Sequence, residues 1–265
     1  MSNVVQKNKN TVNLQEKEER KVLQTILDIG AQMLSSGAEI SRVEESIERM
    51  GRAFGAQKVE CFAITYVIVV TMSMHNTAGL TEIRRIHQFD RNMNKLTSLN
   101  TLSREICENK IGLEEANIRL KMIKEQKTYS LPGKMFIFAL ISLSFTLFFG
   151  GSTVDAIVSA CIGVAMAPVD SILLHTEMNR FVQVFLCAVV AGIFSIAGAM
   201  IWKGVSSELV SIGNIMIFIP GVIFTCGIQE IFSNNMLSGM TRFAEAVILS
   251  LVVATGFAFV NILLW

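Results

Sequence analysis

The sequence predicts a membrane protein in which a cytoplasmic α+β domain precedes an α-helical bundle of five transmembrane spans. Of its 265 residues, 51% are hydrophobic and 17% are charged, whereas a soluble domain carries about 25% charged residues. The mean hydropathy is +0.49. Almost all charged residues lie before Lys134, and those after it occur singly. This uneven distribution indicates two units rather than one large core.

The N-terminal half begins with a polar stretch and continues with two amphipathic helices. Residues 1–17 are rich in Asn and Lys and lack the apolar stretch of a signal peptide, so we interpret them as a flexible polar tail. Residues 18–130 form the predicted α+β domain. Ser36-Gly37-Ala38-Glu39 is typical of a capping box that opens the second helix, and Gly55 ends that helix. The first helix is indicated by apolar residues at three- and four-residue steps: Val22, Leu23, Ile26, Leu27, Gly30, Met33 and Leu34.

The remainder of this domain contains the predicted strands. Residues 59–74 are apolar and β-branched, but they are too short and too often interrupted by Thr and Ser for a membrane span of about 20 residues. They predict one long buried strand, or two strands with a bend near Thr65. A turn at residues 75–79 leads to an edge strand over residues 80–88. Two helices follow, marked by Leu96, Leu99, Leu102 and Ile106, and by Leu113, Ala116, Leu120 and Ile123.

Residues 131–265 are predicted to form the transmembrane domain. Each apolar stretch approaches the length that crosses a hydrocarbon core of about 30 Å. Basic residues concentrate on one side of these stretches, at Lys124, Lys127, Lys134, Arg180 and Arg242, against Lys203 on the other. The N-terminal domain is therefore expected in the cytoplasm and the C-terminus outside. The spans are expected near residues 133–150, 154–173, 181–202, 208–227 and 243–264.

Two carboxylates mark the second stretch as more than an anchor. Asp155 and Asp170 lie near its two ends, and small residues at four-residue steps between them favour close helix packing. Ionisable groups at membrane depth usually face a cavity or a partner, which predicts a role in transport. Carboxylates that lie only at the membrane interfaces would weaken that argument.

The fourth stretch contains Asn214 and then Pro220-Gly221. Proline removes a backbone donor, so a break or kink is expected there. Broken helices can bind a substrate or an ion through exposed backbone groups, although a simple proline kink is an equal alternative. A polar group follows at the expected cytoplasmic mouth, where a solvated loop is the alternative: Glu230, Asn235, Arg242 and Glu245.

Several kinds of function are excluded or disfavoured. The five cysteines form no Cys-x-x-Cys pair, and the three histidines lie far apart, so neither a metal site nor a cofactor is expected. A net charge of +1 gives no reason to expect nucleic acid as a partner. The sequence has no His-Glu-x-x-His, no phosphate-binding loop and no Gly-x-Ser-x-Gly, so nothing indicates an enzyme.

Two motifs resemble those of the threonine/serine exporter family. The first is Gly37-Ala38-Glu39-Ile40-Ser41-Arg42-Val43-Glu44-Glu45, followed by Phe54-Gly55 and the apolar strand. The second is Pro220-Gly221, followed by Gln229-Glu230-Ile231 and the segment 238–245. The resemblance runs in order from about Leu23 onward and is greatest to the larger, N-terminal component. Gln229-Glu230 stands where the family pattern leads us to expect Arg-Asp.

The resemblance implies a subunit of a secondary-active exporter in the plasma membrane, with L-threonine and L-serine as substrates and the proton motive force as the energy source. It also implies a small five-span partner protein, with a homo-oligomer as the alternative, because an odd number of spans gives half of an inverted-topology pair. Other interpretations are a dicarboxylate (succinate-type) exporter subunit and a membrane-anchored sensory or scaffold protein. The predicted path residues are Asp155, Asp170, Asn214, Pro220, Gly221, Glu230, Asn235, Arg242 and Glu245, and the cytoplasmic motif contains Gly37, Glu39, Arg42 and Glu44.

Overall fold

The computed structural model describes residues 2–74, 79–87, 92–126, 130–174, 176 and 178–264, with side chains described from Glu16 to Leu263. It divides the chain into two units. The first unit contains residues 1–126 and 229–241, and the second contains residues 127–228 and 242–265. The segment 229–241, which the sequence places in the membrane half, therefore groups with the N-terminal domain.

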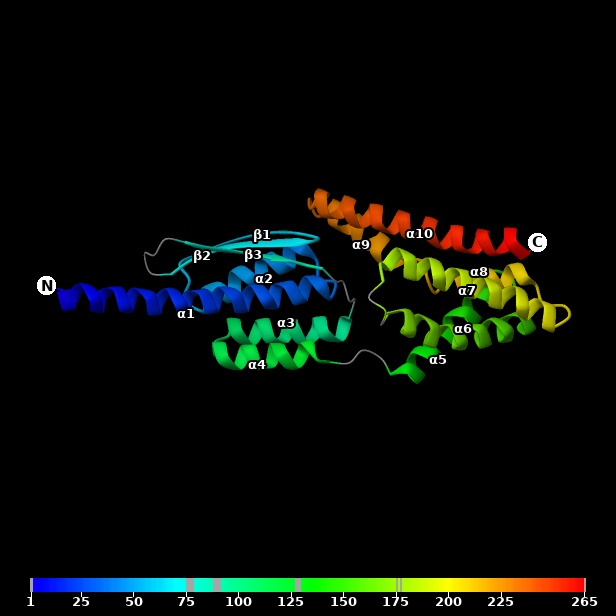
Figure 1. The fold of residues 1–265 in the computed structure, drawn as a ribbon, viewed down its shortest axis with the longest axis horizontal. Coiled ribbons are helices and arrows are strands. Elements are labelled where there is room, and N and C mark those ends of the chain that lie inside the picture. The colour runs from blue at the N-terminus through cyan, green and yellow to red at the C-terminus, as the bar shows by residue number, and fades with distance from the viewer. Residues whose placement is uncertain are drawn as a thin grey trace. The chain divides into compact units, whose positions relative to one another are not determined.

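The first unit is built in three layers (Figure 1). A three-stranded antiparallel sheet in the order β1-β2-β3 covers one side of α1 and α2, and α3 and α4 cover the other. Its elements are α1 (Ser2–Ser35), α2 (Ile40–Ala53), β1 (Lys58–Ile64), β2 (Val67–Ser73), β3 (Leu80–Arg85), α3 (Met93–Cys107) and α4 (Leu113–Lys124).

Burial follows the periodicity of each element in this unit. Every second residue of β2 is buried, including Ile68, Val70 and Met72, because successive side chains of a strand point to opposite faces. The two-strand alternative for residues 59–74 is correct, and Ile64 pairs with Val67 across a two-residue loop. Of the turn expected at residues 75–79, residues 75–78 lie outside the described part of the chain. The core-facing residues of α2 are Ile40, Val43, Ile47 and Met50.

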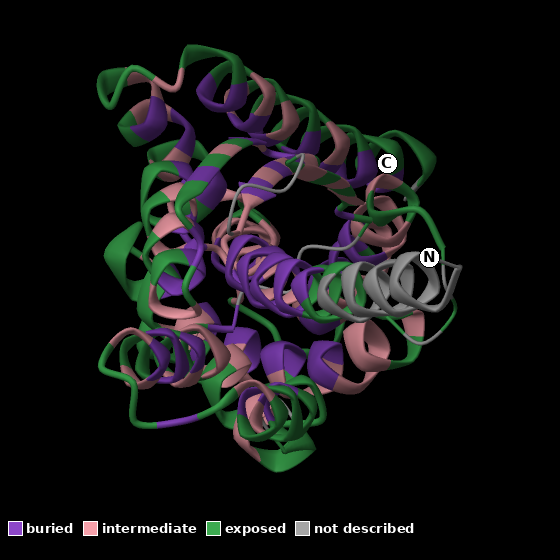
Figure 2. Ribbon diagram, turned by 90° about the vertical axis from the view of Figure 1, so that its left-hand side faces the viewer, coloured by how far each residue is buried: buried purple, intermediate pink, exposed green. Residues whose placement is uncertain are grey.

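Two expectations for the start of the chain differ from the structure. Helix α1 begins at Ser2, whereas we expected a flexible tail through residue 17. Neither Gly nor Pro occurs before Gly30, so nothing local stops the helix from extending past its packed part, which is largely buried after Lys21 (Figure 2). The capping box is also wrong: Gly37, at φ 99°, ends α1, and Glu39 is the N-cap of α2 without a side-chain hydrogen bond to its N–H groups.

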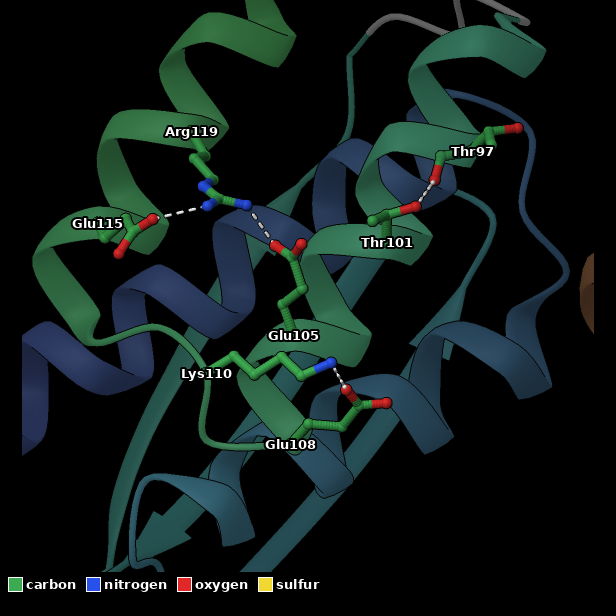
Figure 3. Close-up of polar contacts among 7 residues, drawn as sticks. All are labelled: Thr97, Thr101, Glu105, Glu108, Lys110, Glu115 and Arg119. Atoms are coloured by element: carbon green, nitrogen blue, oxygen red, sulfur yellow. Dashed lines mark hydrogen bonds and ion pairs between the residues drawn. The ribbon is translucent and has the colours of Figure 1, made fainter.

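The α3–α4 hairpin is joined by an ion-pair network on its surface (Figure 3). The Arg119 guanidinium lies between Glu105 of α3 and Glu115 of α4 and pairs with both. Lys110, in the connection between the two helices, pairs with Glu108 at 2.5 Å. Because these groups are substantially exposed, each pair contributes little to the stability of the hairpin.

The second unit is helical and strongly apolar. Four of its helices are long and apolar enough to cross a membrane, counted over the described residues: α5 (Leu131–Phe148), α6 (Thr153–Leu174), α7 (Arg180–Ile201) and α10 (Met236–Leu264, apolar through Leu263). The stretch expected as a fourth continuous span, 208–227, instead forms two short helices, α8 (Ser207–Ile215) and α9 (Gly221–Phe232). The break expected at Pro220-Gly221 separates them.

Small residues allow close packing in this unit, as expected for α6. A Cβ atom at Gly163 would lie 2.7 Å from the Phe138 carbonyl oxygen and 2.7 Å from Ser142 Oγ of α5. In α10, the buried hydrophobic residues are Ala246, Leu249, Val253, Phe257 and Val260. These residues recur at three- and four-residue steps, so one apolar face of α10 packs into the core.

Candidate functional site

A fully buried group of polar side chains lies in the second unit. We call Ser142 and Thr146 of α5, Ser159 of α6 and Asn214 of α8 the polar core cluster; each has 0% exposure. Ser142 Oγ donates to Asn214 Oδ1 over 2.9 Å, and Asn214 Nδ2 donates to Ser159 Oγ over 3.1 Å. Thr146 Oγ1 donates to Ser159 Oγ over 2.8 Å. Buried polar groups are costly unless they are hydrogen-bonded, and these side chains provide one another's partners.

The three helices approach closely at this cluster because glycine lies opposite it. A Cβ atom at Gly213 would lie 2.0 Å from Thr146 Oγ1, 2.9 Å from the Ser142 carbonyl oxygen and 3.0 Å from Ser159 Oγ. Ser142 and Thr146 lie four residues apart on one face of α5, and Thr146 Oγ1 also contacts the Ser142 carbonyl oxygen at 2.8 Å. The polar core cluster therefore joins α5, α6 and α8 through hydrogen bonds in surroundings that are otherwise apolar.

Asp155 lies in the first turn of α6 and is 4% exposed. Its Oδ2 atom accepts hydrogen bonds from the Ser152 N–H at 2.8 Å and from Ser152 Oγ at 2.7 Å. Its Oδ1 atom accepts from the Ser206 N–H at 2.8 Å. Ser206 is in turn the N-cap of α8, so this carboxylate connects the starts of α6 and α8.

Asp170 forms an ion pair at the opposite end of α6. Its Oδ2 atom lies 2.6 Å from Lys134 Nζ of α5, with 17% and 22% of the two side chains exposed. Its Oδ1 atom accepts a hydrogen bond from Gln183 Nε2 of α7 at 3.1 Å. Lys134 also donates to Ser171 Oγ at 3.1 Å. Asp155 and Asp170 are separated by roughly 22 Å along the helix, at about 1.5 Å per residue, so they form two sites and not a pair.

Pro220 and Gly221 form the connection from α8 to α9. The Pro220 carbonyl oxygen accepts the first helical hydrogen bond of α9, from the Phe224 N–H at 3.0 Å. Gly221 is exposed, and a Cβ atom there would meet nothing within 4 Å. Because α8 ends at Ile215, five residues separate the two helices and provide a point at which their axes can change direction.

Two further predicted path residues lie in the part of α10 that belongs to the second unit. Glu245 Oε1 is 3.0 Å from Arg180 Nη1 at the start of α7. Arg242 is 4% exposed. A buried guanidinium and an ion pair argue against the alternative of a fully solvated loop in this segment.

The other two predicted path residues, Glu230 and Asn235, lie in the segment that groups with the first unit. Glu230 is 2% exposed and Asn235 is half-buried. Between them Asn234 has φ 63°, and the Asn235 N–H donates to the Glu230 carbonyl oxygen over 2.9 Å. The positive φ ends α9 and lets the chain turn directly into α10.

The cytoplasmic motif supports this same segment. Glu39 Oε1 accepts a hydrogen bond from Ser233 Oγ at 3.1 Å, and Glu39 is also 4.0 Å from the largely exposed Arg42. Glu44 Oε1 accepts from the Ala63 N–H of β1 at 2.7 Å. Gly37 provides the turn between α1 and α2. Two members of the motif therefore bind backbone or side-chain groups outside their own helix, which is unusual for a merely solvated helix face.

Burial shifts the pKa of two groups beside β1. It raises the pKa of the Glu44 carboxyl, although the Ala63 N–H works in the opposite direction. Burial, together with the charges of Glu44 and Glu48, raises the pKa of the Cys61 thiol to about 12. Cys61 is therefore a poor nucleophile. No group of three or more His, Cys, Asp or Glu side chains in the described ranges is placed to hold a metal ion.

Sequence reasoning missed several residues that the structure brings together. In the sequence, Lys134 indicates only the orientation of the spans, and Ser142 and Thr146 fall within an apolar stretch. Their four-residue spacing was a usable signal, because two hydroxyls on one helix face indicate a polar contact in an apolar span. Thr65 and Ser238 lie 173 residues apart and are joined by a hydrogen bond, a contact that the sequence does not predict. Pro168, which lies inside α6, was also missed.

Comparisons with known proteins find relatives among membrane transport proteins. The model of the threonine/serine exporter family, ThrE, matches residues 24–264. The chain is similar to "Probable succinate transporter subunit YjjP" of Klebsiella aerogenes, at 24% identity over 90% of this chain and 92% of that protein. It is also similar to "Probable threonine/serine exporter" of Mycobacterium tuberculosis, at 20% identity over 89% of this chain and 45% of that protein.

A fungal relative shares a shorter region. "Pheromone-regulated membrane protein 10" of Candida albicans is 30% identical over 62% of this chain and 15% of that protein. The chain thus spans nearly all of the Klebsiella aerogenes relative, less than half of the Mycobacterium tuberculosis relative and 15% of the Candida albicans relative. No solved structure matches. Because the family match covers nearly the whole chain, including the polar core cluster and the cytoplasmic motif, the chain belongs to the threonine/serine exporter family of membrane transport proteins.

Proposed function

We propose that the chain is one subunit of a secondary-active exporter of small polar metabolites, with L-threonine and L-serine as its substrates. The polar core cluster is the observation that carries the proposal. It places two serines, a threonine and an asparagine at 0% exposure inside an apolar helical unit. Asn214 lies on a short helix that ends just before the Pro220-Gly221 break. Transporters commonly place their substrate sites at such interrupted helices.

The charges of the second unit support an amino-acid substrate. Lys134 pairs with Asp170, and Arg180 pairs with Glu245. Each of these two sites therefore contains one cationic and one anionic side chain. A zwitterion needs an anionic and a cationic partner, whereas a dicarboxylate needs two cationic ones. The printed name of the Klebsiella aerogenes relative favours succinate as the second candidate, and the transport assay below discriminates the two.

The proposed topology has five membrane crossings. Helices α8 and α9 together would be about 31 Å long at 1.5 Å per residue, close to a hydrocarbon core of about 30 Å, and would form one discontinuous crossing. With the four long helices, this gives an N-terminal domain in the cytoplasm and a C-terminus outside the plasma membrane, in agreement with the basic residues beside the spans.

An odd number of crossings supports a partner of opposite orientation, which we propose to be a small five-span protein; a homo-oligomer is the alternative. The chain covers 92% of a relative whose name calls it a subunit, but 45% of the exporter from Mycobacterium tuberculosis. The longer relative has room for a second membrane unit in the same chain. Inverted-topology pairs allow a central site to open alternately to each side.

Proton coupling is assigned to Asp170 in this proposal. Asp155 accepts three hydrogen bonds that connect helix ends, which suits a structural acceptor. Asp170 instead faces the ammonium of Lys134, a flexible side chain that can turn away when the carboxylate is neutralised. The proposed path also includes Asn214, Pro220, Gly221, Arg242 and Glu245, with Glu230 and Asn235 at its cytoplasmic side.

Efflux of radiolabelled threonine, serine and succinate from preloaded cells tests the proposal, with the chain expressed alone and together with its candidate partner. We expect faster efflux of threonine and serine than of succinate. Asn214→Leu should reduce the initial rate at least tenfold at equal membrane abundance. Asn261→Leu is the matched control, since Asn261 bonds only within α10, to the Phe257 carbonyl oxygen.

Faster efflux of succinate alone would reassign the substrate to the dicarboxylate class. Unchanged efflux of all three compounds, with and without the partner, would contradict the exporter assignment and favour the sensory or scaffold interpretation. Wild-type efflux by the Asn214→Leu variant would show that the polar core cluster is not part of the transport path.

A further inference from the structure

The loop between β1 and β2 binds the start of α10, directly after the turn that joins α9 to α10. The Thr65 N–H donates to Ser238 Oγ over 3.2 Å, and Thr65 Oγ1 donates to the Ser238 carbonyl oxygen over 3.4 Å. Thr65 Oγ1 also lies 3.1 Å from Thr241 Oγ1. Thr65 and Ser238 are each 3% exposed. We call Thr65, Ser238 and Thr241 the turn clamp; all three lie in the first unit.

The conformation of this loop does not follow from the hairpin alone. The favoured two-residue loops need positive φ at one or both positions and therefore Gly, Asn or Asp. Thr65 and Tyr66 occupy the loop, and neither has a positive φ. The loop thus lacks the usual hairpin residues and presents a hydroxyl and an N–H to Ser238 instead. The residues of this loop are therefore better explained by its contact with Ser238 than by the needs of the β1–β2 hairpin.

The first unit fixes Thr65 from both sides. Glu44 of α2 accepts the Ala63 N–H two residues before it, and the Ile86 N–H donates to the Tyr66 carbonyl oxygen at 2.8 Å just after it. A second attachment joins Glu39 to Ser233 at 3.1 Å, on the other side of the α9–α10 turn. The α9–α10 turn is therefore held at two points by a folded sheet and helix.

Helix α9 connects this clamp to the break in the spanning unit. It runs without interruption from Gly221, beside Pro220, to Phe232, beside Ser233. Because an α-helix of this length is stiff, a constraint on one of its ends limits the movement of the other.

We propose that Thr65 is a positioning residue for transport: it holds the α9–α10 turn against the soluble domain and thereby restricts movement of α9 about the Pro220-Gly221 hinge. The transport part rests on the proposed function, whereas the mechanical part does not. The proposal assigns a mechanical role to the first unit, because the cytoplasmic motif residues Glu39 and Glu44 then support the turn clamp rather than bind a ligand.

Hydrogen exchange of the full-length protein in detergent tests the mechanical part. Ser238→Ala removes the acceptor of the Thr65 N–H, and Thr65→Val removes the hydroxyl at nearly constant volume. In both variants we expect amides in residues 229–241 and in the hinge, residues 216–221, to exchange about fivefold faster, as for loss of one hydrogen bond of ~1 kcal/mol. Thr71→Val is the matched control, because it removes a hydroxyl bond to Thr81 within the same sheet.

Efflux is measured in parallel on the same variants. The proposal predicts a changed maximal rate with an unchanged substrate concentration for half-maximal efflux, since the clamp does not contact substrate. Unchanged exchange in residues 229–241 would overturn the clamp. Faster exchange there without any change at residues 216–221 would overturn the link to the hinge. If the wild type exports none of the substrates, the proposed function fails, and the exchange data still decide the clamp.

Discussion

The Ser206 N–H donates to Asp155 Oδ1 over 2.8 Å, so a carboxylate in the first turn of α6 fixes the residue that caps α8. Helix α8 carries Asn214, whose amide joins Ser142 of α5 to Ser159 of α6. Asp155 therefore contributes to the polar core cluster through the placement of α8, without belonging to it.

Asp155→Asn should weaken folding and leave proton coupling intact. The amide nitrogen of Asn cannot accept the two hydrogen bonds from Ser152 that the second carboxylate oxygen accepts. We expect a loss of about 1–3 kcal/mol in the free energy of unfolding, seen as a lower melting temperature in detergent. The pH dependence of efflux should be retained. An unchanged melting temperature together with pH-independent efflux would reverse the roles assigned to Asp155 and Asp170.

Removal of one member of the Lys134–Asp170 pair should cost more than removal of both. A single Asp170→Asn change leaves an ammonium without its carboxylate, and we expect a loss of about 1–3 kcal/mol, below the ~3–5 kcal/mol of a fully buried pair. The Lys134→Met/Asp170→Asn double variant should recover part of this loss in thermal unfolding. A double variant less stable than either single one would contradict a direct pairing.

Gly213→Ala should disrupt the contact of α5, α6 and α8. Its added Cβ would meet Thr146 Oγ1 at 2.0 Å, which forces the helices apart. We expect a loss of about 1–3 kcal/mol and low membrane abundance. Gly133→Ala is the control, because its Cβ would meet only Ser130 Oγ, at an ordinary 3.4 Å. Similar membrane abundance of the two variants would contradict the close packing of α5, α6 and α8 at Gly213.

The contribution of Glu44 to the stability of the first unit should fall as the pH rises. Burial raises the pKa of its carboxyl in the folded state, so the folded protein binds the proton more tightly. The resulting stabilisation is complete below the unfolded pKa of about 4.3 and is lost as the pH rises through the higher folded pKa. Glu44→Gln should therefore stabilise the protein more at pH 7 than at pH 4, measured by thermal unfolding. An equal effect of Glu44→Gln at both pH values would contradict the shift.

The division into a mixed domain and an apolar helical unit could be predicted because it depends on local patterns. Helix α2 shows its buried face in the spacing of Ile40, Val43 and Ile47, and Pro220 marks the break after α8 because proline acts on its own backbone. The start of α1 at Ser2 could not be foreseen from polarity, since polar residues without Gly or Pro are compatible with a helix.

The candidate site was only partly predictable. Asp170 and Asn214 stood out because polar groups are rare in apolar spans. Their partners Lys134, Ser142 and Ser159 depend on which helix faces meet, and the sequence does not give that pairing. The same holds for Thr65 and Ser238, which are brought together only when the segment 229–241 folds as part of the first unit.

Transport by purified protein in lipid vesicles tests the central claim most directly. The chain and its candidate partner are reconstituted with radiolabelled threonine inside, and an inward proton gradient is imposed while release is followed. We predict that the gradient accelerates release by the wild type and that Asp170→Asn releases threonine at a rate independent of the gradient. Release equal to that of protein-free vesicles, with or without the gradient, would contradict the account.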